Sequence, residues 1–220
     1  MAWTMSGWLD SRPIIPVVIS DAPEIAADLA NALDAGGVTC AEITLRTPRG
    51  LELLMAMVAH APAGFAVGAG TVLDLYQVDA VAGAGASFVV SPGYDPEIVD
   101  RARALGMAVL PGVASATEVQ RARRDGVETV KFFPADRLGG WETIAAFAGV
   151  FDGVGFVPSG GVGADNLDRY LSLPAVPAVS GSWLAPRREL DAGDFSVVVE
   201  RSRSAIRIAA ESCPSGRSIR

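Results

Sequence analysis

Eight short runs of apolar residues recur along this chain at intervals of about 20 to 27 residues. Each run is almost continuously apolar and is closed by Gly, Pro, Ser or Thr, which is typical of parallel strands buried on both faces. The runs cover residues 14–20, 40–45, 65–70, 87–92, 108–113, 129–134, 155–161 and 177–183. This spacing leaves room for a helix between one run and the next, and so predicts repeated β-α units.

The stretches between the runs carry helix signals. Asp21, Pro23 and Glu24 predict a capped helix start, and Ser115 with Glu118 forms a capping box. Strands that alternate with helices favour a parallel sheet, and eight such units close a barrel. We therefore predict the α/β class, as a single-domain (β/α)8 TIM barrel over residues 1–211 with an extra N-terminal helix at about residues 3–11. Residues 212–220 are polar and are expected to be a flexible tail.

A doubly wound open sheet is the alternative fold. It predicts a GxGxxG turn after the first strand, but the first run is followed by Ser20-Asp21-Ala22-Pro23. No long linker rich in Pro, Gly or Ser divides the chain, which favours one domain.

The composition of the 220-residue chain excludes several classes of function. The net charge is −7 and basic residues form only short clusters, so we expect no nucleic-acid partner. No apolar run reaches the ~18 residues of a membrane span and no signal-peptide pattern is present, so we expect a cytoplasmic protein without a membrane partner. The single histidine, His60, and two cysteines, Cys40 and Cys213, lack metal-ligand spacing, so we expect no metal and no cofactor.

Lysine is rare in this chain. Of the 18 basic residues, 17 are arginines and one is a lysine, Lys131, which lies in the apolar run 129–134. Side chains alternate along a strand, so Lys131 points into the barrel while Val130 and Phe132 point outward. A bias towards arginine codons explains the arginines, and a salt-bridged lysine at a strand edge is the alternative role. Because a desolvated lysine attacks carbonyls and arginine does not, we predict that Lys131 forms a Schiff base.

Glu42 and Arg46 are the predicted partners of this amine. Both share the inward face of the run 40–45, with Arg46 just beyond its end at the mouth of the barrel. Glu42 is suited to pair with the ammonium and to move protons, with a purely structural ion pair as the alternative. The planar fork of Arg46 fits a carboxylate, with an exposed ion pair at the rim as the alternative. His60 closes a helix at the opposite end of the barrel, which excludes a Ser-His-Asp triad.

Glycines and serines follow the last two runs. Ser159, Gly160 and Gly161 precede a helix expected to start at residues 163–166, and Ser180-Gly181-Ser182 ends the eighth run. In this fold the loops after strands seven and eight are the usual place for a phosphate, so these residues predict an anion subsite.

Five segments resemble the KDPG/KHG aldolases, class I enzymes that act on 2-keto-3-deoxy-6-phosphogluconate and 4-hydroxy-2-oxoglutarate. The resemblance extends from residue 16 to the last helix. The segments are Glu42-Ile43-Thr44-Leu45-Arg46-Thr47, Gly68-Ala69-Gly70-Thr71-Val72, Ser91-Pro92-Gly93, Lys131-Phe132-Phe133-Pro134-Ala135 and Gly181-Ser182-Trp183-Leu184.

The resemblance implies a role for each site residue. Lys131 would form the imine and Glu42 would move protons. Arg46 and Thr71 would hold the pyruvyl carboxylate, and Pro92 and Phe133 would shape the pocket. The distal end of the substrate would meet four further residues, Ser159, Gly160, Gly161 and Ser182. The resemblance also implies a homotrimer.

Three functions follow as hypotheses. The first is a class I aldolase that releases pyruvate from a 2-keto-3-deoxy acid. The second is another phosphate-binding barrel, such as a thiamine-phosphate synthase-like transferase. The third is a non-catalytic barrel that binds sugar acids. The inward pair of Glu42 and Lys131 argues against the third, because stability does not require a buried ion pair.

Overall fold

The computed structural model describes residues 5–9 and 11–212. Its strands are β1 (Ile14–Val18), β2 (Cys40–Thr44), β3 (Ala66–Gly70), β4 (Phe88–Val90), β5 (Ala108–Leu110), β6 (Gly112–Val113), β7 (Thr129–Phe132), β8 (Gly155–Pro158) and β9 (Val179–Gly181). Its α-helices are α1 (Met5–Leu9), α2 (Ala26–Ala35), α3 (Gly50–His60), α4 (Leu75–Gly83), α5 (Pro96–Ala104), α6 (Ala116–Arg124), α7 (Gly140–Ala148), α8 (Leu167–Leu171), α9 (Arg187–Asp191) and α10 (Phe195–Ser212). Two 3-10 turns, η1 (Pro23–Ile25) and η2 (Asp136–Leu138), complete the described elements.

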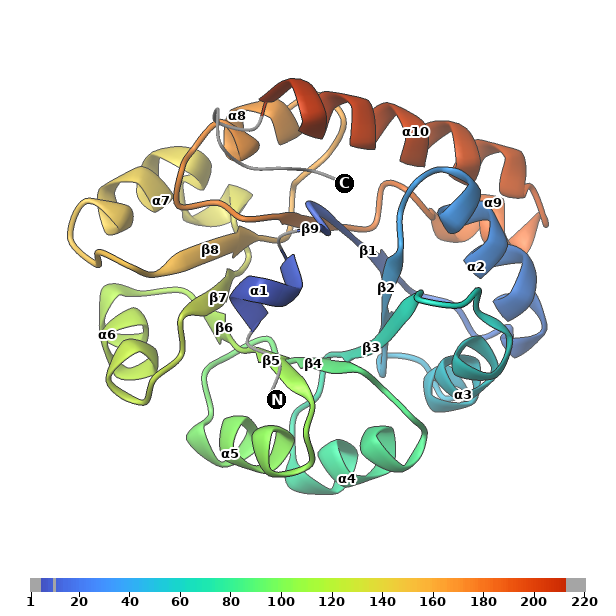
Figure 1. Cartoon of the computed structure of the whole chain (residues 1–220), viewed down its shortest axis with the longest axis horizontal. Helices are drawn as coiled ribbons and strands as arrows, with labels where there is room; N and C mark the ends of the chain where they lie inside the picture. Colours follow the sequence, from blue (N-terminus) through green and yellow to red (C-terminus); the bar gives the residue numbers. More distant parts are fainter. Residues whose placement is uncertain (1–4, 10, 213–220) are drawn as a thin grey trace.

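The strands form two parallel sheets. One has the order β5-β4-β3-β2-β1-β9 and the other β6-β7-β8. A parallel bridge between Ser159 and Ser180 links the end of β8 to β9. Figure 1 looks along the axis of this arrangement and shows the strands in a ring with the helices from α2 onward outside it. The α/β class and the parallel pairing are thus confirmed.

The expected fifth strand is divided into β5 and β6 at Pro111. Proline has no N–H to donate to a neighbouring strand. The carbonyl oxygen of Pro111 still accepts a hydrogen bond of 2.8 Å from the backbone nitrogen of Lys131. Consequently β5 pairs with β4 and β6 pairs with β7, and the ladder is interrupted between the two sheets.

The two faces of the strands bury different side chains. Ile15, Cys40, Phe88, Val157 and Ala178 belong to a cluster inside the ring, together with apolar residues of α1. Their outward neighbours pack against the surrounding helices in the larger cluster. The same alternation, two positions beyond Cys40, Val157 and Ala178, directs polar side chains into the ring; these are Glu42, Ser159 and Ser180.

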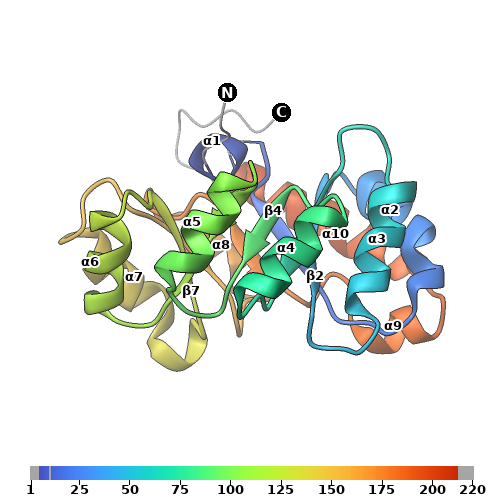
Figure 2. The same cartoon turned by 90° about the horizontal axis from the view of Figure 1, so that it is seen from below.

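Helix α1 covers one end of the ring. Its Trp8 packs on Phe88 with ring centroids 4.6 Å apart, and Phe88 is the first residue of β4. In the side view α1 lies above the strands, at the end where they begin (Figure 2). The carboxyl ends of the strands therefore face the opposite, uncovered end.

Several predicted boundaries need correction. The helix expected at residues 163–166 begins at Leu167, because Asn166 occupies its N-cap position and residues 164–166 form a turn. The helix expected at Asp21 begins as η1 and is not capped by that side chain. In the N-terminal helix expected at residues 3–11, α1 covers Met5–Leu9, and residues 3, 4 and 10 lie outside the described residues. Ser212 ends α10, and the remainder of the expected tail, residues 213–220, also lies outside the described residues.

Helix length and hydropathy decide whether a helix can span a membrane. Within residues 5–9 and 11–212, no helix combines the length and the apolar character needed to cross a bilayer.

Candidate active site

Lys131 and Glu42 form a buried ion pair across the ring. Lys131 lies on β7 and Glu42 on β2, and the ammonium Nζ is 3.2 Å from the carboxylate Oε1. The residues are 7% and 1% exposed. Val130 and Phe132, the neighbours of Lys131, point outward into the larger apolar cluster, as alternation predicts. A primary amino group and a carboxylate thus meet at a buried position inside the ring.

The carboxylate of Glu42 occupies space that a glycine leaves open. A Cβ atom on Gly70, in β3, would lie 2.2 Å from Glu42 Oε1. No side chain larger than hydrogen fits there without moving the carboxylate. Gly70 is therefore part of the site, whereas a Cβ atom on Gly68 would instead meet the ring of Phe88.

Ser180, which the sequence interpretation placed only beside the expected anion subsite, also contacts the buried ion pair. Its hydroxyl donates a hydrogen bond of 3.4 Å to Glu42 Oε2, and the residue is fully buried. Period-two alternation back from Ser182 would have placed it on the inward face.

Arg46 lies on the exposed turn after β2. Its guanidinium has no ion pair or hydrogen bond with any residue that the structure describes. The rim ion pair considered as its alternative role is thus absent there, and the side chain is open to an anionic ligand.

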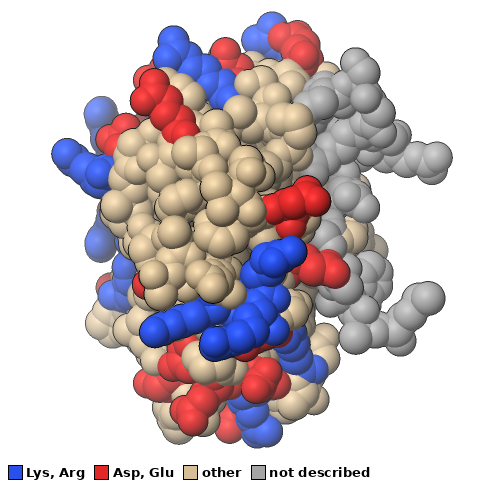
Figure 3. Space-filling model, turned by 90° about the vertical axis from the view of Figure 1, so that its left-hand side faces the viewer, with Lys and Arg blue, Asp and Glu red and all other residues tan. Residues whose placement is uncertain are grey.

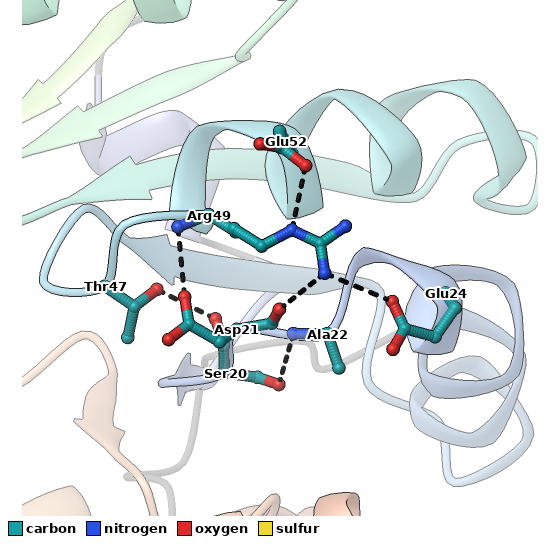
Figure 4. Close-up of polar contacts among 7 residues, drawn as sticks. All are labelled: Ser20, Asp21, Ala22, Glu24, Thr47, Arg49 and Glu52. Atoms are coloured by element: carbon teal, nitrogen blue, oxygen red, sulfur yellow. Dashed lines mark hydrogen bonds and ion pairs between the residues drawn. The ribbon is translucent and has the colours of Figure 1, made fainter.

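Arg49, three residues further on, instead forms hydrogen bonds and ion pairs through both its side chain and its backbone. Its Nε donates to Glu52 at 3.0 Å, and its guanidinium lies 3.8 Å from Glu24. Its backbone nitrogen donates to the Asp21 side chain at 3.0 Å. Figure 4 shows these contacts tying the loop after β1 to the loop after β2, where Thr47 donates to the carbonyl of Ser20. Asp21 thus fixes the loop that carries Arg46 and does not cap a helix.

Thr71 follows β3 with φ at +61°, the only non-glycine residue in the described chain with a positive φ. A β-branched residue in this region is strained, and such strain is concentrated at functional sites. Pro92 lies half-buried after β4, and Phe133 follows β7 with its ring 5.5 Å from Lys131 Nζ. All three therefore stand at the carboxyl ends of the strands.

Replacing Thr71 with glycine is expected to separate the effect of its backbone strain on stability from the effect of its hydroxyl on substrate binding. Glycine adopts positive φ freely, so we expect the free energy of unfolding to stay unchanged or rise by up to about 1 kcal/mol. The family resemblance implies that the Thr71 hydroxyl binds a substrate carboxylate, so its loss is expected to raise the KM about tenfold. Urea unfolding and steady-state kinetics measure the two effects. Thr71→Ala, which loses the hydroxyl but keeps the strain, is the control, and an unchanged KM in both variants would exclude a binding role.

The four distal residues follow the ends of two strands, Ser159, Gly160 and Gly161 after β8 and Ser182 after β9. Ser159 is buried, while Gly160 and Gly161 have φ of +87° and +82°, which favours glycine. The backbone nitrogen of Asp136 donates to the carbonyl of Gly160 at 3.0 Å. Ser182 is exposed after β9. Because α8 starts only at Leu167, the backbone amides of these glycines belong to a loop and not to a helix terminus.

His60 and Cys40 lie away from these residues. His60 is the exposed last residue of α3, where its Nδ1 contacts the carbonyl of Ala56 at 2.7 Å. Cys40 begins β2 inside the ring, and burial raises the pKa of its thiol to about 12, so it stays protonated at neutral pH. Among the described residues, no three His, Cys, Asp or Glu side chains gather as a metal site would require.

A surface hollow outside the ring lies between α6 and α7. It measures about 800 Å³ and includes Arg121, Arg123 and Arg124 beside Val150 and Phe151. Figure 3 views this side of the molecule and shows a broad uncharged area with basic side chains below it and acidic ones along other parts of its margin. The hollow contains neither Lys131 nor Glu42, so it is separate from the candidate site.

Comparisons with known proteins agree with the geometry. The family model described as KDPG and KHG aldolase matches residues 6–201. A 2-dehydro-3-deoxy-phosphogluconate aldolase from Treponema pallidum (strain Nichols) is 43% identical over 91% of this chain and 95% of its own length. The crystal structure of a Legionella pneumophila KDPG aldolase, with pyruvate captured as a covalent carbinolamine, has a TM-score of 0.87 at 36% identity and covers 91% of this chain and 97% of its own. A thiamine phosphate pyrophosphorylase from Pyrococcus furiosus shares the fold alone, with a TM-score of 0.67 at 17% identity over 93% of this chain and 98% of its own.

Proposed function

The chain belongs to the KDPG and KHG aldolase family, and we propose that it cleaves 2-keto-3-deoxy acids through an imine on Lys131. The substrates are 2-keto-3-deoxy-6-phosphogluconate, which gives pyruvate and glyceraldehyde 3-phosphate, and 4-hydroxy-2-oxoglutarate, which gives pyruvate and glyoxylate. One observation carries the proposal. The only lysine of the chain lies buried 3.2 Å from a buried carboxylate, at the strand ends where this fold performs chemistry.

The reaction begins at the Lys131 amine. The ammonium first passes a proton to Glu42, and the neutral nitrogen attacks the C2 carbonyl of the substrate to give a carbinolamine. Glu42 returns that proton to the carbinolamine hydroxyl, which leaves as water, and a protonated imine remains. Glu42, through a water, then accepts the proton of the C4 hydroxyl. The C3–C4 bond breaks, the aldehyde leaves, and the electron pair passes into the imine to form an enamine. Protonation at C3 and hydrolysis release pyruvate and restore the amine.

The other residues orient the substrate. Arg46, which has no partner in the described chain, and the hydroxyl of Thr71 would bind the carboxylate next to C2. Pro92 and Phe133 would shape the pocket around the reacting carbons. Ser159, Gly160, Gly161 and Ser182 would meet the phosphate or the distal carboxylate.

The finer architecture follows the same proposal. We infer a single (β/α)8 domain over residues 1–211, with β5 and β6 acting as one interrupted strand and α1 as an extra helix. The Ser159–Ser180 bridge and the ring of strands support closure. We also infer a cytoplasmic homotrimer, for which the exposed apolar side chains of Leu73 and Tyr76 offer contact surface.

Two rival functions make different predictions. A thiamine-phosphate synthase-like transferase would depend on pyrophosphate and magnesium, and would not need an amine. The Pyrococcus structure supports only a shared fold. A non-catalytic binding barrel would be stabilised by sugar acids without turnover. Neither rival accounts for a buried lysine at this position.

Trapping with borohydride tests the proposed imine. Pyruvate with borohydride is expected to add a stable adduct to Lys131 and to inactivate the protein, because reduction converts the imine to a secondary amine. Peptide mapping distinguishes Lys131, as the only lysine, from the amino terminus. An adduct found nowhere, or only at the amino terminus, would refute the proposal. A coupled assay that compares the phosphorylated and unphosphorylated acids then ranks the substrates.

A further inference from the structure

Ser180 is a buried hydroxyl that the reaction described above does not use. It is fully buried in β9, in register with Ile15 of β1, and bridged to Ser159 at the end of β8. Serine is not a strong strand former, and an apolar residue would fill such a position at lower cost. Its hydroxyl points to Glu42 Oε2 at 3.4 Å.

The two oxygens of the Glu42 carboxylate have different partners. Oε1 receives the ammonium of Lys131 at 3.2 Å and Oε2 receives the Ser180 hydroxyl. Within the described chain, these are the two side chains that donate to this carboxylate. One partner is the reacting group itself, and the other is a neutral hydroxyl.

The two partners therefore behave differently during the reaction. In the protonated imine the Lys131 nitrogen keeps a single hydrogen and is held by its bond to the substrate carbon, and in the enamine it loses its positive charge, so its hold on the carboxylate weakens as the reaction proceeds. The Ser180 hydroxyl stays uncharged and unchanged throughout. Resting on the function proposed above, we infer that Ser180 is a positioning residue that holds Glu42 Oε2 and so keeps Oε1 directed at the substrate after the imine has formed.

At 3.4 Å the contact is longer than the about 2.5–3.0 Å of a fully formed hydroxyl–carboxylate bond, so it must shorten in the reacting complex for Ser180 to hold Glu42. A hydroxyl–carboxylate bond is shortest when fully formed, and catalytic hydrogen bonds are often longer in ligand-free proteins than in the reacting complex. With the ammonium still present, Oε1 is drawn towards Lys131. Release of that attraction lets the carboxylate settle on Ser180.

Replacing Ser180 with alanine is expected to slow proton transfer while leaving imine formation intact. We expect kcat to fall about tenfold to a hundredfold, less than the about 10²–10⁴-fold that a general base contributes, because Glu42 itself remains, with KM changed less than about twofold. The exchange of pyruvate methyl hydrogens with deuterated water, followed by NMR, should slow by a similar factor. Borohydride trapping on Lys131 should keep its wild-type yield. Ser180→Cys, which retains a weak donor, should fall between alanine and serine.

Ser202→Ala provides the matched control. Ser202 is also fully buried, but its hydroxyl lies on α10 without a hydrogen-bond partner among the described residues. We expect wild-type kcat from this variant. Wild-type kcat in Ser180→Ala, an equal loss in Ser202→Ala, or loss of imine trapping in Ser180→Ala would each overturn the inference. Failure of the wild-type protein to form any imine would instead refute the proposed function, so the two failures are distinguishable.

Discussion

Replacing Lys131 with arginine is expected to abolish aldol cleavage. The guanidinium keeps the positive charge opposite Glu42 but stays protonated and cannot attack a carbonyl. We expect kcat/KM for the keto-deoxy acid to fall at least about a thousandfold, which corresponds to about 4 kcal/mol of lost transition-state stabilisation. The rate of pyruvate release measures this loss, and borohydride should leave no adduct at residue 131 of the variant.

Arg121→Lys is the control for this experiment. It places a lysine on the surface of α6, next to the hollow between α6 and α7, away from Glu42. Its activity should match the wild type, and borohydride trapping should still select Lys131 over the new amine. Full activity of Lys131→Arg would support the transferase alternative, because that chemistry does not use an amine.

The central pair of the site could be predicted from the sequence. Apolar runs closed by small residues located the strands, and alternation then placed Lys131 and Glu42 inward. Both steps depend on local patterns that hold for any buried parallel strand. The structure brings these two side chains into contact although they lie 89 residues apart in the sequence.

Other parts of the site depend on tertiary contacts and could not be predicted. Arg46 and Arg49 both follow β2, and the sequence does not distinguish them. Only the structure shows that Asp21, Glu24 and Glu52 contact Arg49 and leave Arg46 without such contacts among the described residues. The hydrogen bond from the Arg49 backbone nitrogen to the Asp21 side chain also explains why Asp21 does not cap a helix. The positive φ of Thr71 is likewise imposed by its surroundings, because no local preference of threonine favours it.

The energetics of the Lys131–Glu42 pair can be separated from its chemistry. Replacing Lys131 alone with methionine leaves a carboxylate that is 1% exposed without its cation. Breaking a buried pair in this way is expected to lower the free energy of unfolding by about 3–5 kcal/mol. Urea unfolding at a fixed protein concentration measures this loss.

The double variant Lys131→Met/Glu42→Leu removes both charges. Replacing a buried pair with apolar side chains is often neutral or stabilising by about 1–4 kcal/mol, so we expect its stability to return to the wild-type value or exceed it. Ser180 loses its acceptor in this variant, so Ser180→Ala is added in a third variant to remove the orphaned hydroxyl. A double variant as unstable as Lys131→Met would show that the pair stabilises the fold. If the double variant regains wild-type stability but has no activity, the fold does not require the two buried charges. The pair would then be retained for the reaction and not for stability.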